Sequence, residues 1–459
     1  MQSLISLPTE ILHQIIRSVE PGSLKTLRQV CRSLGEIGKE HLFESVTVYA
    51  TEESCDGFVD FLENEDGDCI QSVTKVYLDL SEFEGLYSYD TYNDETSNEP
   101  MEKEFRKFVR LFPRLKELPR LRSVVLRFHP DCSEDGDSDV PHTLGLRSAV
   151  MKEFLSAITA LPQLPRELAI RDLQNVNESN SDEVERIEKV LQNLCSLRLN
   201  IANPHNQGNP ECDLYHDEIH TFFSALPSFW LKPALQNLEH LTIYSSHYFG
   251  YYPKLDLRGV HFPRLRTLAL GNYTFVHDSQ LDWILSHRDT LTELYLDDCA
   301  ILWAVAPFDK DKERTYLDPD SYTTHSGLVG HGYATYDKRW HHYFKTLQEL
   351  SHLRHFRYGH SEYWSADEST PFECETDIII GMHEESYLTF TSECYSPELT
   401  YYYGTGRSMK WVDEGPLPWI EEDQTSLEEL LMKIGQKYVI DEATEDQIDR
   451  VRYLGQPRT

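Results

Sequence analysis

Apolar and polar residues alternate with the period of α-helices over the first 45 positions of the chain. In LPTEILHQIIRSVE (residues 7–20) apolar side chains recur every three or four positions, and LKTLRQVCRSL (residues 24–34) repeats this spacing. Pro8 suits a first helical turn, because its missing N–H would have no intrahelical partner there. A further apolar set around residue 40 predicts a third short helix.

So small a helical unit rarely buries all of its apolar surface alone. One interpretation is a helical cap whose remaining apolar face packs on residues 46–80. The other is a docking surface for a second protein. Exposure of Leu7, Pro8, Ile11 and Ile15 would favour docking, and their burial would favour the cap.

Beyond residue 50 a second pattern, L-x-x-L-x-L, recurs and predicts one β-strand per copy. The copies are LRSVVL at 121, LCSLRL at 194, LEHLTI at 238, LRTLAL at 265, LTELYL at 291 and LRHFRY at 353, with degenerate forms at 73 and 164. Helical segments such as EVERIEKVLQNL and IHTFFSAL lie between copies. We expect an α/β fold, an irregular leucine-rich-repeat horseshoe. The alternative is a nonrepetitive α/β domain with coincidental leucine spacing.

Alternation along each strand predicts which side chains line the open face of such a sheet. If the leucines point inward, the residues between them form a mixed polar and aromatic surface suited to a client protein. The candidate client-binding residues are Arg127, Arg198, Asn200, His240, Tyr244, Tyr295, Asp297 and Arg357. Three arginines on one face could bind a carboxylate or a phosphate, whereas the acidic chain as a whole favours a basic client.

The last third of the chain departs from the repeat. Residues 302–345 form a long insertion rich in Tyr, His and Gly, which could be a binding loop or a packed flap. Residues 361–459 predict a β-rich cap followed by a final helix, TSLEELLMKIGQKYV, with Thr425 or Ser426 as its N-cap.

The net charge of the chain limits the kinds of partner that it can bind, and its cysteines indicate the compartment in which it resides. The 459 residues contain 77 acidic and 43 basic side chains, a formal net charge of −34, which repels phosphate backbones and anionic lipid. We therefore expect no nucleic-acid and no membrane partner. Nine scattered cysteines without a C-x-x-C pair indicate reduced thiols, as in the cytoplasm or nucleus.

Candidate chemistry is sparse. No G-x-S-x-G, P-loop or dinucleotide fingerprint occurs, so we predict neither an enzyme nor a cofactor. DCSEDGDSDVPH (residues 131–142) is spaced like a calcium loop but ends in His142 instead of a bidentate Glu, and we interpret it as a solvated acidic loop. The histidines between 325 and 342 are interpreted as unliganded, so no metal is predicted.

A basic cluster at residues 106–122 follows a strongly acidic segment at 52–104, within which YSYDTYNDETSNEP (87–100) predicts a flexible loop. Charge compensation within the chain explains this arrangement. The alternative is recruitment of a phosphorylated client.

The N-terminal string LPTEILHQII…LKTLRQVCRSLGEIGKEHLFESVTV resembles the F-box, from residue 4 to about residue 49. One departure is that Ser33 and Leu34 stand where many F-boxes have Trp. The resemblance implies that this segment binds a Skp-type adaptor, and through it a cullin. The residues that match its contact motifs are Leu7, Pro8, Glu10, Ile11, Leu12, Ile15, Leu24, Leu27, Val30, Cys31 and Arg32.

The whole chain loosely resembles fungal F-box proteins with degenerate leucine-rich repeats. That resemblance implies a substrate receptor of an SCF-type (cullin-RING) ubiquitin ligase. The alternative is a repeat scaffold with no link to ubiquitination. The expected domains are an F-box at 1–49, a linker region with an early strand and acidic loop at 50–117, repeats at 118–360, and the β-rich cap at 361–459.

Overall fold

The computed structural model describes residues 7–19, 21–27, 29–63, 69–83, 100–133, 142–203, 214–361, 372–403, 408–413 and 420–438. The chain divides into two compact units. Unit 1 comprises residues 1–129, 133–171 and 180–194, and unit 2 comprises 130–132, 172–179 and 195–459. Most of the predicted acidic loop and of the calcium-like loop lie outside the described residues.

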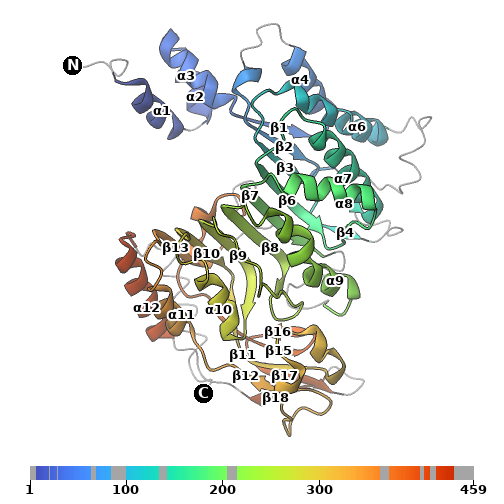
Figure 1. Cartoon of the computed structure of the whole chain (residues 1–459), viewed down its shortest axis with the longest axis vertical. Helices are drawn as coiled ribbons and strands as arrows, with labels where there is room; N and C mark the ends of the chain where they lie inside the picture. The colour runs from blue at the N-terminus through green and yellow to red at the C-terminus, as the bar shows by residue number, and fades with distance from the viewer. Residues whose placement is uncertain are drawn as a thin grey trace. The chain divides into compact units, whose positions relative to one another are not determined.

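Unit 1 begins with the predicted helices, α1 (Thr9–Arg17), α2 (Pro21–Leu27) and α3 (Arg32–Leu42), which are drawn in blue in Figure 1. They share a small core of buried side chains: Leu12, Ile16, Leu24, Leu34 and Ile37. His13 Nδ1 lies 2.9 Å from His41 Nε2 and links α1 to α3. The helical period thus predicted three helices here, but the expected helix at residues 24–34 was wrong, because α2 ends at Leu27 and α3 begins at Arg32.

Four parallel strands follow in unit 1, in the order β1 (Ser45–Tyr49), β2 (Lys75–Asp79), β3 (Ser123–Arg127) and β6 (Glu167–Gln174). The two-residue strands β4 (Cys132–Ser133) and β5 (His142–Thr143) pair separately. Short 3₁₀ turns, η2 (Ile70–Ser72) and η3 (Phe112–Glu117), precede β2 and β3. Helices α4 (Glu52–Glu63), α6 (Pro100–Val109), α7 (Leu144–Thr159) and α8 (Ser181–Leu191) pack side by side along one face of the sheet (Figure 1).

In unit 2, the parallel strands are β7 (Ser196–Ala202), β8 (His240–Phe249), β9 (Thr267–Phe275), β10 (Glu293–Asp297) and β13 (His355–His360). The short β14 (Ile379–Ile380) pairs antiparallel with β13. The connections contain α9 (Asp217–Leu226), the π-helical turn η4 (Pro227–Leu231), η5 (Lys232–Ala234) and α10 (Asp278–Leu285).

Strands β7 to β10 and β13 each begin at the third residue of an L-x-x-L-x-L copy, as β7 does at Ser196 in the copy that starts at 194. The register then aligns the fourth residue of every copy. Leu197, Leu241, Leu268, Leu294 and Phe356 form one row, each with 0% of its surface exposed. The strand positions and inward leucines are therefore confirmed, while a horseshoe shape stays a prediction.

The segment at 302–345 is an ordered structure. Its strand β11 (Ala300–Pro307) is buried at every position and pairs in parallel with β15 (Tyr387–Ser392) and with the end of β9. Turns η6 (Asp309–Arg314) and η7 (Pro319–Ser321) lead to β12 (Ala334–Thr335), and α11 (Trp340–Leu347) ends the segment. The packed-flap interpretation fits this burial.

Unit 2 closes with more strands and a helix. After η8 (Glu375–Asp377), β15 forms a hairpin with β16 (Cys394–Ser396), and β17 (Leu399–Tyr403) pairs with β18 (Ser408–Asp413). The last helix, α12 (Ile420–Ile434), begins well before the predicted caps. Ser426 is buried inside the helix and Thr425 Oγ1 donates to the carbonyl oxygen of Glu421, so the prediction of either residue as N-cap was wrong.

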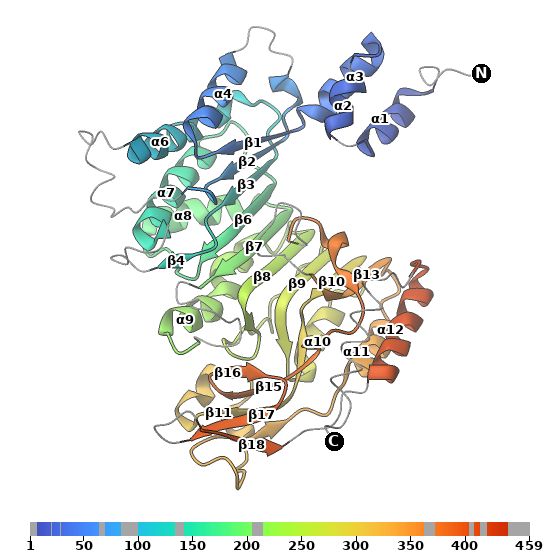
Figure 2. The same cartoon turned by 180° about the vertical axis from the view of Figure 1, so that it is seen from behind.

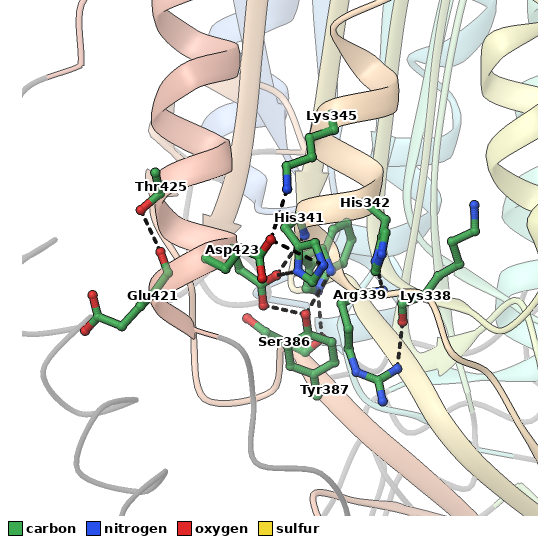
Figure 3. Close-up of polar contacts among 12 residues, drawn as sticks. Lys338, Arg339, His341, His342, Lys345, Ser386, Tyr387, Glu421, Asp423 and Thr425 are labelled. Atoms are coloured by element: carbon green, nitrogen blue, oxygen red, sulfur yellow. Dashed lines mark hydrogen bonds and ion pairs between the residues drawn. The ribbon is translucent and has the colours of Figure 1, made fainter.

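The buried carboxylate of Asp423 attaches α12 to the rest of unit 2. Asp423 Oδ1 accepts hydrogen bonds from the backbone N–H of His341 (2.7 Å) and interacts with His341 Nδ1 (2.7 Å), and Tyr387 Oη donates to Oδ2 (2.5 Å), as Figure 3 shows. Asp423 is completely buried. This clasp joins the first turn of α12 to the first turn of α11.

Candidate functional site

An apolar stripe runs along the outer face of α1. Leu7 and Ile15 are each 37% exposed and Ile11 is 40% exposed, and the adjoining Pro8 is exposed as well. The spacing of four residues places Ile11 and Ile15 on one side of the helix, and Leu7 lies just before its N-cap, Pro8. Val30, in the turn between α2 and α3, is 65% exposed. Apolar side chains that gather on a surface in this way mark an interaction site more often than isolated ones do.

The remaining predicted adaptor-binding residues divide by position. Glu10 and Arg32 are exposed, while Leu27 and Cys31 are partly buried against the helical core. Leu12 and Leu24 belong to that core, with 4% and 5% of their surfaces exposed. A partner could reach these two leucines only by opening the helices, so their role in this structure is internal packing.

The exposure of the stripe bears on the two interpretations of the N-terminal helices. A cap would bury Leu7, Pro8, Ile11 and Ile15 against residues 46–80, and the structure leaves all four exposed. Their opposite neighbours Leu12 and Ile16 already fill the inner face of α1. The observation therefore favours docking of another protein.

The predicted client-binding residues of unit 2 fall into rows across its sheet. Backbone pairing aligns His240 with Ser196 in the first row, Arg198 with Thr242 and Tyr295 with Arg357 in the second, and Asn200 with Tyr244 in the third. These side chains share the face on which the leucines do not lie. Arg127 belongs to unit 1, where its Nη1 lies 3.6 Å from Asp79 Oδ2.

A segment of the chain itself, residues 372–382, lies on this face of unit 2, and we call it the strap (Figure 2). Its Glu375 carboxylate forms an ion pair with Arg198 and accepts from His240 Nε2 at 3.0 Å. Thr242 Oγ1 donates to the same oxygen at 3.4 Å. The sheet thus binds a carboxylate, as the arginines suggested, but the carboxylate is internal.

Backbone contacts of the strap complete its attachment. Arg198 Nη1 donates to the carbonyl oxygen of Phe372 at 3.2 Å, and Arg357 Nη1 donates to that of Ile378 at 2.7 Å. At Gly359 a Cβ atom would lie 1.7 Å from the carbonyl oxygen of Ile379, so only glycine allows this approach. The Phe372 ring stands edge-on to Tyr244, with centroids 6.1 Å apart.

The face of the sheet that was predicted to bind a client is largely buried. Asn200, Tyr244, Tyr295 and Asp297 each have at most 5% of their surface exposed, so the expectation that these residues line an open surface was wrong. Asn200 Nδ2 donates to Asp172 Oδ1 at 3.1 Å, and Ser361 Oγ donates to Asp297 Oδ1 at 2.9 Å.

Sequence reasoning missed Glu375. One signal was present, because residues 358–406 contain acids but no Lys or Arg. Such a segment, following strands that carry arginines, is a suitable internal partner for them.

Electrostatics favour an ionised Glu375. Burial by itself raises the pKa of this carboxyl, but the hydrogen bond from His240 and the charge of Arg198 outweigh it, and the pKa is lowered. Burial lowers the pKa of His240, which the Glu375 hydrogen bond only partly offsets. A neutral imidazole donating Nε2–H to a carboxylate fits both directions.

Other candidate features resolve into structural roles. Lys107 of the basic cluster pairs with Asp56 at 2.5 Å, and Arg114 pairs with Glu63 at 3.1 Å and Glu117 at 2.9 Å, which is charge compensation within unit 1. Within the described ranges, no group of three or more His, Cys, Asp or Glu side chains could hold a metal ion. The cysteines that the structure describes are free thiols.

Comparison with protein families matches one region of the chain. A family model described as F-box-like matches residues 4–48, which contain α1, α2, α3 and most of β1. This match supports the assignment of an F-box protein. Comparison with curated proteins gave no match. In the part of the chain that the structure covers, no helix is both long and apolar enough to span a membrane.

Proposed function

We propose that the protein is the substrate receptor of an SCF-type ubiquitin ligase. In this proposal the N-terminal helices bind a Skp-type adaptor, the adaptor links the chain to a cullin, and the body that follows holds a client protein. The chain performs no chemistry itself. Its resemblance to fungal members with degenerate leucine-rich repeats, and a place in the cytoplasm or nucleus, belong to the same proposal.

The exposed stripe on α1 is the observation that carries the proposal. Leu7, Ile11 and Ile15 remain in water although the helices already share a core of their own, and they lie inside the F-box-like match. Covering these side chains with a partner protein would remove their apolar surface from water, which is favourable.

The proposed mechanism is proximity. A receptor that holds a client beside a charged conjugating enzyme raises the effective concentration of the client's lysines, and no catalytic group in the receptor is needed. The competing function is a repeat scaffold unconnected to ubiquitination. It shares the body but requires no adaptor.

The experiment is a binding titration of a purified Skp-type adaptor against the full chain and an Ile11→Asp, Ile15→Asp double variant. Loss of two apolar contacts of about 1.5 kcal/mol each corresponds to at least about 100-fold weaker binding. The thermal unfolding of the chain should hardly change, because both side chains are already exposed.

Thr9→Asp is the matched control. Thr9 is exposed on the same helix, about 200° around from Ile11, and an acid there suits the helix N-terminus. We expect this variant to bind the adaptor like the wild type. If the well-folded wild-type chain does not bind the adaptor, the receptor proposal is contradicted, and the repeat scaffold becomes the favoured function.

A further inference from the structure

Three donors converge on the Glu375 carboxylate and form what we call the cradle: the Arg198 guanidinium, the His240 imidazole and the Thr242 hydroxyl. They stand on the adjacent strands β7 and β8, where the register aligns Arg198 with Thr242. His240 Nε2 also lies 2.9 Å from Thr242 Oγ1, so the two β8 side chains hold one another in place. The cradle is therefore built on rigid sheet positions.

The chemistry of the cradle suits an anion in general. A guanidinium with planar donors, an imidazole N–H and a hydroxyl are groups that bind carboxylate and phosphate oxygens alike. Because the site is largely buried, the charge of Arg198 is weakly screened by water. Glu375 fills the site with a carboxylate that the strap directs inward, while Asp377 on the same strap is exposed.

The other hydrogen bonds that the arginines of the sheet make to the strap go to its peptide backbone. Arg198 and Arg357 donate hydrogen bonds to the backbone carbonyl oxygens of Phe372 and Ile378. Every extended peptide has such carbonyl groups. The strap thus shows how the sheet would hold a separate peptide. The arginines would donate hydrogen bonds to the carbonyl groups of the peptide, and the cradle would bind an acidic side chain between those groups.

We propose that the cradle is the anion-binding site for a client protein, and that an acidic or phosphorylated client side chain displaces Glu375 from it. This inference rests on the proposed receptor function, because it identifies the client chemistry of that receptor. Glu375 acts as an internal competitor, which keeps weakly binding anions out.

Chemical rescue tests the cradle. Glu375→Ala vacates the carboxylate position in the full chain, and inorganic phosphate and acetate are then titrated at constant ionic strength with calorimetry and thermal unfolding. If Glu375 fills the cradle in nine of ten wild-type molecules, the variant binds the anion about tenfold more tightly than the wild type does. Tighter binding of phosphate than acetate indicates a phosphorylated client, and the reverse indicates a carboxylate.

A second substitution checks that the cradle is responsible. In the Arg198→Ala, Glu375→Ala double variant the gain in anion binding should disappear and the anion should no longer raise the unfolding temperature. Equal binding by the single and double variants, or no binding by a folded single variant, would overturn the proposal.

Displacement of the strap is tested separately, which also covers a Glu375→Ala chain that fails to fold. Hydrogen exchange of residues 372–382 is measured in the wild type with and without a phosphothreonine peptide, and in Gly359→Ala, which forces the Ile379 backbone away. We expect faster exchange in both cases, because each displaces the strap from the sheet. A strap that stays equally protected in both would contradict displacement.

Adaptor binding is measured with the same variants. The cradle and the α1 stripe belong to different units, so we expect adaptor binding to be unchanged by substitutions at 198, 359 and 375. Loss of anion binding with intact adaptor binding sinks only the client inference. Loss of adaptor binding by the wild type sinks the receptor proposal whatever the cradle does.

Discussion

At the scale of single residues, His360 is a side chain whose charge changes above neutral pH. Its Nδ1 lies 2.5 Å from Asp298 Oδ1, and this hydrogen bond, opposed by burial and aided by the charges of Asp298, Asp297 and Glu385, raises the pKa of His360 from 6.5 to about 9. His383 stacks beside it, with ring centroids 6.3 Å apart. The fold therefore favours the protonated imidazole.

The sign of the pH effect follows from linkage. A histidine with a raised pKa adds stability that is complete below pH 6.5 and is lost as the pH rises through about 9. We expect the wild type to lose stability relative to His360→Gln over this range. Denaturant unfolding of both proteins at about pH 6 and about pH 10 measures it, because the other titrations largely cancel in the difference. A difference that does not change with pH would contradict the assignment.

At the scale of elements, the Asp423 clasp decides how firmly α12 is docked. Asp423→Ala would leave the donors of His341 and Tyr387 without their buried acceptor, at a cost of about 3 kcal/mol. We expect α12 to lose hydrogen-exchange protection at residues 420–434 and the unfolding midpoint to fall.

The neighbouring Glu422 offers the control for this prediction. It pairs with Lys345 at 3.0 Å on the surface, where both side chains are about half exposed, so Glu422→Gln should hardly change stability. Equal effects of the two substitutions would show that the buried contacts of Asp423 do not hold the helix.

Elements with a complete local signal were predictable from the sequence. The leucine pattern located β7 to β10 and β13 because a buried strand needs apolar side chains at alternate positions, as Leu197 and Leu199 illustrate. The start of α12 was missed because its predicted N-cap was Thr425 or Ser426, whereas its anchor, His341, is distant in the sequence. Local patterns do not report such long-range contacts.

The same distinction applies to the candidate site. Helical spacing predicted an apolar α1 but did not separate the exposed Ile11 and Ile15 from the buried Leu12 and Ile16, and Leu7 was identified by the F-box resemblance. The internal anion could not be located, since Glu375 lies far along the chain from Arg198 and only folding brings the two together. The alternation of side chains along the strands predicted correctly which face of the sheet carries Arg198, but it did not predict that the strap covers this face.

At the scale of the whole molecule, charge opposes compactness. A formal net charge of −34 makes distributed acidic groups repel one another, whereas buried pairs such as Arg198 and Glu375 are little affected by salt. Raising the salt concentration from about 0.01 M to about 0.15 M shortens the screening length from about 30 Å to about 8 Å.

We therefore expect the unfolding temperature of the chain to rise over this range of sodium chloride. Calorimetry in sodium chloride and in sodium fluoride separates screening from ion-specific effects. Screening alone raises the unfolding temperature equally in both salts at the same concentration. An unfolding temperature that falls with added salt would show that exposed attractive pairs outweigh the general repulsion.

The repeat of strand and connection has a consequence for how such a chain can change over generations. Every strand of the unit 2 ladder begins at the same place in its motif. The motifs at 238, 265 and 291 start 27 and 26 residues apart, whereas the next, at 353, starts 62 residues further on. Closing a longer connection costs little free energy. Insertions and deletions between strands are thus nearly neutral, and a lineage can acquire or discard surface segments while its ladder persists unaltered.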